Sequence, residues 1–326
     1  MKIAAVLPHV EVFGGVRRYI EIGNELVKRG HDYVLFHPEG KPPGWLAFQG
    51  SVRSFDSLDN EAFDVGLCSE YSILPHFDRL RARSKFFYFV LEGHKMEKAV
   101  AGRNYHFLGN SEGICRRIER KHKIRCLKAA GGINPEIFHP VESRPPRDTL
   151  NILCYGRIYK RRKGIRYALR AVEGLYREFP QVRLVLFDTR VGGDLRDPRP
   201  MIKTRMPFDF YLDLAQDRMA WLFSQADLFV SAELRAGWSN TSAEAMACGV
   251  PVVCTPSGTR DFAFHNRTAL VVPLAMPYLL RRRIRQLILD QGLRQRLAQA
   301  GYKKIQEFTW SALADRLVEI FQSVQN

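Results

Sequence analysis

The sequence has no apolar run approaching about 18 residues, the length that a membrane-spanning helix requires. The apolar stretch from Ile3 to Leu7 is too short for a signal peptide, and we expect it to form a first buried strand. The six cysteines form no C-x-x-C pair, which favours reduced thiols in the core over disulfides. These absences favour a cytoplasmic protein.

Several motifs of metal-dependent and nucleophilic catalysis are also missing. No D-x-D triplet is present, which argues against a metal-bridged diphosphate, and neither an H-E-x-x-H motif nor a cysteine cluster indicates zinc. No G-x-S-x-G elbow indicates a hydrolase. The sequence therefore predicts no metal site and no cofactor.

What the chain has in excess is positive charge. It carries 50 Lys and Arg against 34 Asp and Glu, a net charge of +16. Such a surface attracts polyanions, whether nucleic acid, anionic lipid headgroups or phosphorylated small molecules. After residue 145 the count is 28 against 17, so the second half is the better candidate for binding an anion.

The length of 326 residues indicates two domains. Apolar runs of strand length alternate with amphipathic helical stretches along the whole chain, and most of these runs are continuous, as in strands that are covered on both faces of a parallel sheet. The expected strands are 2–8, 32–37, 64–69, 85–91, 105–109, 124–128, 151–155, 182–187, 228–232, 250–254 and 269–273. This series predicts an α/β protein with two Rossmann-like, doubly wound parallel sheets.

The predicted division between the domains is the polar, proline-containing stretch from Glu142 to Asp148. It separates an N-terminal domain, 1–143, from a C-terminal domain, 149–309. The last helix, 310–326, has one apolar face and is expected to pack back on the first domain. Ligands of such sheets bind beyond the carboxyl ends of the strands, so we expect the two domains to face each other across a cleft.

The most informative segment is 236–253, A-G-W-S-N-T-S-A-E-A-M-A-C-G-V-P-V-V. It predicts a small polar turn after strand 228–232 and then a short helix, 240–247. A helix that starts after such a turn offers free N–H groups and a positive dipole end to an anion, with an ordinary capped helix as the alternative. The candidate ligand-binding residues are Ser239, Asn240, Thr241 and, one turn into the helix, Glu244.

The run from Glu244 to Val252 resembles the signature of retaining family-4 glycosyltransferases, which are of the group 1 type and share the GT-B fold. The resemblance implies that Glu244 binds the ribose of a nucleotide diphosphate-sugar donor. The family's first glutamate, which contacts the donor sugar, is replaced here by Ala236. Glu233, three residues earlier, is our candidate substitute.

A second motif, 156–164, reads G-R-I-Y-K-R-R-K-G and lies between a strand and a helix. Cations at the carboxyl end of a strand can neutralise a diphosphate and stabilise a leaving group, although a bare charge run is more often a solvated face. The motif is similar to the family's G-R and K-G pattern, with one extra residue in the gap. The resemblance makes Arg157 and Lys163 the expected diphosphate ligands and catalytic cations, with Arg162 as the alternative to Lys163.

Two further sites fall in the first domain. Gly14 and Gly15 follow the first strand and resemble the family's glycine loop, which reaches the donor phosphates; a plain tight turn is the alternative. His94 follows an apolar strand, where it or Glu92 would position an acceptor hydroxyl, and a surface histidine is the alternative.

The expected partners are a nucleotide diphosphate-sugar and a saccharide or lipid-linked acceptor, as in the synthesis of cell-surface polysaccharide. Two basic clusters, 116–128 and 281–285, also suit an anionic membrane surface on the cytoplasmic side, or are merely solvated helix faces. Two other functions stay open: a non-catalytic nucleotide or sugar binder, suggested by Ala236, and a nucleic-acid-binding protein. No recognised module supports the latter, so we expect no nucleic acid.

Overall fold

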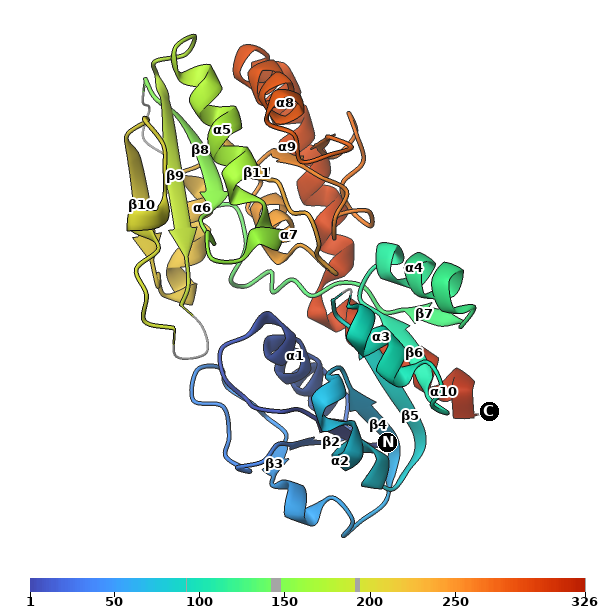
Figure 1. The fold of residues 1–326 in the computed structure, drawn as a ribbon. Coiled ribbons are helices and arrows are strands. Elements are labelled where there is room, and N and C mark those ends of the chain that lie inside the picture. Colours follow the sequence, from blue (N-terminus) through green and yellow to red (C-terminus); the bar gives the residue numbers. More distant parts are fainter. Residues whose placement is uncertain (92, 142–147, 191–193, 326) are drawn as a thin grey trace. The chain divides into compact units, whose positions relative to one another are not determined.

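The computed structural model describes residues 1–91, 93–141, 148–190 and 194–325, and the side chain of His94 also lies outside the described part. The chain divides into two compact units, unit 1 (Met1–Gly132 with Trp310–Asn326) and unit 2 (Ile133–Thr309). Each unit is built on one parallel sheet with helices on both faces (Figure 1). The predicted class, α/β with two doubly wound sheets, is confirmed.

The sheet of unit 1 has the strand order β3-β2-β1-β4-β5-β6-β7, and all of these pairings are parallel. The order reverses between β1 and β4, the kind of switch point at which doubly wound sheets bind ligands. The strands are β1 (Lys2–Val6), β2 (Asp32–Phe36), β3 (Ser51–Arg53), β4 (Phe63–Cys68), β5 (Ala82–Phe89), β6 (His106–Gly109) and β7 (Cys126–Lys128).

Strand β1 is covered on both faces, which accounts for its uninterrupted apolar sequence. Ile3 and Ala5 belong to a core formed with two helices, α1 and α10, whereas Ala4 and Val6 belong to a core formed with α2, α3 and α4. The apolar face of the C-terminal helix thus packs in unit 1. The helices are α1 (Gly14–Lys28), α2 (Leu74–Arg79), α3 (His94–Val100), α4 (Glu112–His122) and α10 (Trp310–Gln325).

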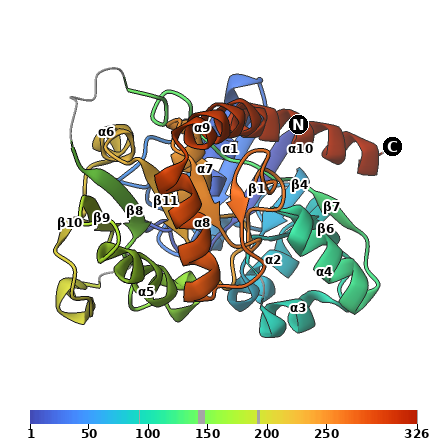
Figure 2. The ribbon, with the colours of Figure 1, turned by 90° about the horizontal axis from the view of Figure 1, so that it is seen from above.

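The sheet of unit 2 has the order β10-β9-β8-β11-β12-β13, again wholly parallel. Helices α5 and α8 pack side by side on one face (Figures 1 and 2), and Phe223 of α6 packs on Phe187 and Phe229 on the other. The strands are β8 (Leu150–Tyr155), β9 (Val182–Asp188), β10 (Phe208–Leu212), β11 (Leu228–Ser231), β12 (Val252–Cys254) and β13 (Leu270–Val271). The helices are α5 (Ile165–Tyr176), α6 (Met219–Ser224), α7 (Asn240–Ala247), α8 (Pro277–Leu289) and α9 (Gln291–Ile305).

Two strands were not predicted, and both lie at sheet edges. Strand β3 has only three residues, and β10 is partly exposed along its length, so neither produces a continuous apolar run. The boundary between the units, at Gly132 and Ile133, precedes the predicted linker, most of which lies outside the described residues. The Ile133 N–H donates to Phe308 O at 3.0 Å and Phe138 packs on Phe223, which places both residues in unit 2.

All six cysteines are buried and free of disulfides, as predicted. In the part of the chain that the structure describes, no helix combines the length and the apolar character that crossing a membrane requires.

A buried carboxylate joins α3 to α4 in unit 1. Glu97 is 1% exposed, and its oxygens accept hydrogen bonds from Arg117 (2.8 Å), Lys121 (2.7 Å) and His122 (3.1 Å), all on α4. Burial alone would raise the pKa of Glu97, but the hydrogen bonds from Arg117, Lys121 and His122 outweigh it and lower the pKa to about 2. The ion cluster therefore stabilises unit 1 with Glu97 ionised.

We predict that Glu97→Gln lowers the free energy of unfolding by about 2–4 kcal/mol at pH 7, because it leaves the Arg117 and Lys121 cations beside a neutral amide. The pKa of Glu97 is depressed in the folded protein, so its contribution is full above the ordinary value of 4.5 and declines as the pH falls toward 2. Urea unfolding at pH 7 and pH 3 measures both effects. The control is Glu319→Gln, an exposed partner of Arg316, which should cost at most about 0.5 kcal/mol. Equal losses in the two variants at pH 7 would contradict the assignment.

Candidate functional site

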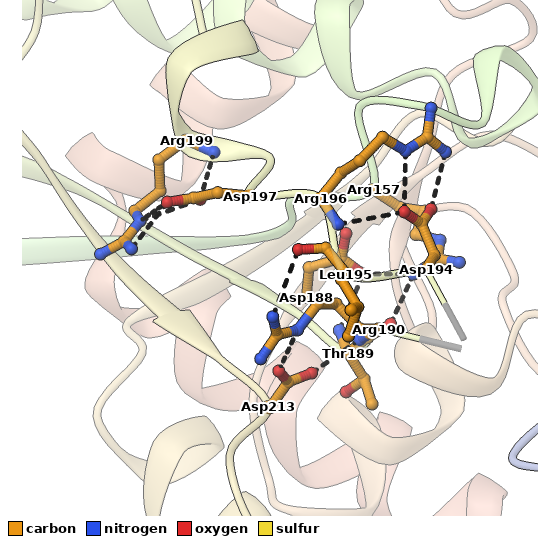
Figure 3. A network of polar contacts seen from close by, with 10 residues as sticks. All are labelled: Arg157, Asp188, Thr189, Arg190, Asp194, Leu195, Arg196, Asp197, Arg199 and Asp213. Atoms are coloured by element: carbon orange, nitrogen blue, oxygen red, sulfur yellow. Dashed lines mark hydrogen bonds and ion pairs between the residues drawn. The ribbon is translucent and has the colours of Figure 1, made fainter. Parts of the chain in front are cut away.

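Arg157 follows β8 and turns toward the end of β9 (Figure 3). Its Nη1 donates to Asp188 Oδ1 at 3.1 Å and to Thr189 O, and the side chains of Arg157 and Asp188 are both buried. Asp188 is the last residue of β9, and its Oδ1 also accepts the Thr189 N–H at 2.8 Å. Burial raises the pKa of Asp188, and the Arg157 guanidinium only partly opposes this. The predicted phosphate ligand is thus half of a buried ion pair.

Lys163 ends the same turn and forms a second ion pair. Its Nζ donates to Glu233 Oε1 at 2.6 Å, with 17% of the lysine side chain and 3% of the glutamate side chain exposed. Glu233 lies two residues beyond the end of β11, so this pair joins the turn after β8 to the turn after β11. The structure therefore brings Lys163 and Glu233 together.

The backbone fixes the same two turns against each other. Arg162 O accepts the Leu234 N–H at 2.8 Å, and the Arg162 guanidinium donates to Arg235 O at 3.4 Å. Gly164 has φ +67°, and a Cβ there would lie 1.9 Å from Ala232 O. Both the backbone conformation and the space therefore require glycine after Lys163, which explains the K-G pair of the motif.

Tyr155, the last residue of β8, lies between the two ion pairs. The Lys163 Nζ is 5.5 Å from the centre of the Tyr155 ring. Burial raises the pKa of Tyr155, the charges of Asp188 and Glu233 raise it further, and that of Arg157 lowers it. Because β8, β9 and β11 are parallel and the paired residues lie at or just beyond their carboxyl ends, both ion pairs lie at the same end of the sheet.

Helix α7 presents one narrow face outside the core. Asn240 and Glu244, one turn apart, are half-buried, whereas the other six residues of the helix are buried. Ser239 precedes the helix, and its Oγ donates to Ser242 Oγ at 2.9 Å instead of capping the first N–H groups. The open face of α7 therefore begins with uncapped N–H groups and carries Glu244 one turn on.

Three buried polar atoms between β11 and α7 lack a hydrogen-bond partner within the described ranges. They are Glu233 Oε2, Trp238 Nε1 and Thr241 Oγ1. An unsatisfied buried polar group costs about 1–3 kcal/mol, so such groups are rare and require a reason. Two of these atoms belong to the turn after β11 and the third to the first turn of α7, so the segment that leads into α7 holds several unsatisfied polar groups.

Ala236 stands in a tightly packed part of this turn. Its N–H donates to Ser257 Oγ at 2.8 Å, and a Cβ on Gly258 would come within 2.9 Å of the Ala236 Cβ. Glu233, three residues earlier, is held in the same turn, where its backbone O accepts the Thr255 hydroxyl at 2.5 Å.

The remaining predicted residues lie in unit 1. Gly14 and Gly15 are the first residues of α1, with the Arg17 N–H donating to Phe13 O at 2.9 Å, so the motif opens a helix directly. A Cβ on Gly15 would contact Val90 at 4.0 Å. His94 begins α3, but its side chain and Glu92 lie outside the described residues. The roles of all these residues stay predictions.

The loop after β9 carries three more arginines, each beside a carboxylate (Figure 3). The pairs are Arg190 with Asp213 (2.5 Å), Arg196 with Asp194 (2.7 Å) and Arg199 with Asp197 (2.7 Å). The charge of this loop is therefore compensated locally. Over the described ranges, no group of three His, Cys, Asp or Glu is arranged to hold a metal ion.

Sequence reasoning missed Asp188 and Tyr155. Each is the terminal residue of a buried strand, and an acid at the carboxyl end of an apolar run is a signal that the sequence does contain. What the sequence does not contain is their proximity. That follows from the register of β8 on β9, which pairs Tyr155 with Phe187.

Comparisons with known proteins bear on both units. Residues 149–290 match the family described as "Glycosyl transferases group 1". The lipopolysaccharide core biosynthesis glycosyltransferase LpsE of Rhizobium meliloti (strain 1021) is 27% identical over 222 residues, which are 66% of this chain and 63% of LpsE. The chain thus spans a little under two thirds of that relative's length.

Solved structures are similar over nearly the whole chain. Sucrose-phosphate synthase from Thermosynechococcus elongatus has a TM-score of 0.82 at 17% identity, covering 99% of this chain and 98% of its own. HepE from Anabaena, in complex with UDP-glucose, has a TM-score of 0.75 at 15% identity, covering 99% of this chain and all of its own (100%). Residues 149–290 are thus similar to the group 1 glycosyl transferases, and the chain as a whole has the GT-B fold.

Proposed function

We propose that this chain transfers a sugar from a nucleotide diphosphate-sugar to an acceptor hydroxyl, with retention at the anomeric carbon and without a metal ion. The observation that carries the proposal is the Lys163–Glu233 contact, which joins the cationic turn after β8 to the turn that leads into α7. It brings the cationic turn and the start of α7 to the same edge of one sheet. Parallel sheets of this kind bind nucleotides at that edge.

The donor's diphosphate would be held by Arg157, Lys163 and the first N–H groups of α7. Arg157 donates hydrogen bonds to Asp188 and Thr189 through Nη1. Its Nε and Nη2 have no hydrogen-bond partner among the described residues. An uncapped helix N-terminus adds oriented N–H donors. Together these donors would also stabilise the negative charge that develops on the leaving phosphate.

Residues at the same edge of the sheet would bind the ribose and the sugar of the donor. Glu244 on the open face of α7 would accept hydrogen bonds from the ribose hydroxyls, and Asn240 lies one turn before it. Glu233 Oε2, buried and without a partner in the described part of the chain, would accept a hydroxyl of the donor sugar. HepE was solved with UDP-glucose, which supports this class of donor.

The acceptor class is proposed from the relatives. LpsE acts in lipopolysaccharide core biosynthesis, which supports a saccharide or lipid-linked glycan as acceptor. The acceptor hydroxyl would attack on the face that the diphosphate leaves, and no side chain is assigned as a covalent nucleophile. Retention and family 4 rest on the resemblance of the Glu244 motif.

We predict that Arg157→Ala and Lys163→Ala each slow donor consumption about 10²-fold or more, because each removes a cation from the leaving group. The assay measures the nucleoside diphosphate released from UDP-, GDP- and dTDP-sugars without acceptor. Arg161→Ala is the control, since Arg161 is exposed in the same turn, and it should keep a near wild-type rate. Undiminished rates in both variants would refute the site, and binding without any sugar release would favour a non-catalytic binder.

Metal independence and retention can be read in one experiment. With excess EDTA, proton NMR of donor hydrolysis should show an unchanged rate and, from an α-linked donor, the α-anomer of the free sugar first. The reason is that the cations and N–H groups named above replace a divalent ion. Loss of activity that returns with Mg²⁺ or Mn²⁺ would contradict the first part, and initial release of the β-anomer the second.

The exposed stripe of α8 supports the proposed membrane contact. Tyr278 and Leu289 are each 58% exposed and flank Arg281, Arg282 and Arg285 on one helix face. Basic and apolar side chains on one face suit an anionic lipid surface. Arg281→Glu/Arg282→Glu should therefore weaken flotation with phosphatidylglycerol vesicles at low salt, whereas Arg296→Glu/Lys303→Glu, an equal charge change on α9, should not. Equal losses would indicate attraction by net charge alone.

A further inference from the structure

Asp188 is an acid in a place where an anion is expected to bind. It is 4% exposed at the carboxyl end of β9, and its Oδ1 receives both Arg157 Nη1 and the Thr189 N–H (Figure 3). Arg157 Nη1 also donates to Thr189 O, so one end of the guanidinium is tied to β9. A guanidinium is planar with five N–H donors, and fixing one end orients the others.

The surroundings of Asp188 contain little other positive charge. Arg157 is its ion-pair partner, the Tyr155 hydroxyl lies beside it on β8, and Asp188 O accepts the Asp213 N–H at 2.9 Å. The other charged groups nearby come as pairs: Arg190 with Asp213, Arg196 with Asp194, and Lys163 with Glu233. One cation therefore has to serve Asp188 and any anion that binds Arg157.

We infer that Asp188 positions Arg157 for the donor's diphosphate and takes up a proton when that diphosphate binds. This inference rests on the proposed function. With Nη1 held by Asp188 and Thr189 O, Nε and Nη2 are the guanidinium nitrogens that have no hydrogen-bond partner among the described residues. A phosphate on that edge places a second negative charge one guanidinium away from the carboxylate, and a like charge at such a distance disfavours the ionised carboxylate.

The direction of the pH effect follows from the burial of Asp188. In the free protein, burial already raises the pKa of Asp188 above its ordinary value, and the bound diphosphate raises it further. The affinity for the diphosphate is then constant below the pKa that Asp188 has in the free protein. It falls as the pH rises from that value to the pKa of Asp188 in the complex, and it is constant again above the latter. A protonated Asp188 can keep its contact with Arg157 through the carbonyl oxygen.

The test uses UDP-, GDP- and dTDP-glucose as probes, because their diphosphate esters do not titrate between pH 5.5 and 7.5. Isothermal titration calorimetry of the full chain in buffers of different ionisation enthalpy counts the protons taken up per ester bound. We expect wild-type protein to take up about 0.3–1 proton and its affinity to fall several-fold across this pH range. Asp188→Asn should take up none of this proton and bind several-fold tighter than wild type at pH 7.5.

Asp197→Asn is the matched control, since it removes a paired carboxylate from the same loop and should behave as wild type. Equal proton uptake in wild type and Asp188→Asn, or weaker binding by that variant at all pH values, would overturn the inference and leave Asp188 a structural partner. If Asp188→Asn does not fold, absence of proton uptake by wild type overturns it equally. Binding of none of the three esters would instead count against the proposed function.

Discussion

The contact between the turn after β8 and the turn after β11 is the constraint on which the candidate site depends. Lys163 and Glu233 join them by side chains, Arg162 O and the Leu234 N–H join them by backbone, and Gly164 permits the approach to Ala232. Without this contact the cationic motif would be an ordinary charged turn. With it, the cations and the start of α7 belong to one rigid edge, as preorganised electrostatic stabilisation requires.

Each cation assigned to the diphosphate already has an acidic partner, Asp188 for Arg157 and Glu233 for Lys163. A buried charge without a partner is very unfavourable, so the carboxylates keep both cations stable before a ligand arrives. The same carboxylates weaken the attraction for an anion. In the proposed site the carboxylates would thus favour the stability of the free protein over donor affinity, and the N–H groups at the start of α7, which the Ser239 side chain does not cap, would add attraction for the anion.

Much of the fold was predictable because buried parallel strands have continuous apolar sequences, as in β1 and β8. The bounds of α7 were predictable as well, because a polar turn precedes it and Gly249, at φ +71°, follows it. Edge strand β10 was not, since its partial exposure removes the apolar run. The partners of Arg157 and Lys163 were not predictable either. They lie 31 and 70 residues away, and strand order and register bring them close.

The replacement of the motif's first glutamate by Ala236 gains a physical explanation from the same turn. The Cβ of Ala236 packs against the backbone near Gly258, and the Ala236 N–H is held by Ser257, so this position serves the packing of the turn. We propose Glu233, three residues earlier, as the source of the carboxylate, because one of its oxygens accepts from Lys163 and the other is buried without a partner in the described structure. A free acceptor oxygen fixed by a neighbouring cation is suited to receive a sugar hydroxyl. On this proposal the departure from the motif moves the acidic group within the turn and does not by itself argue against transferase activity.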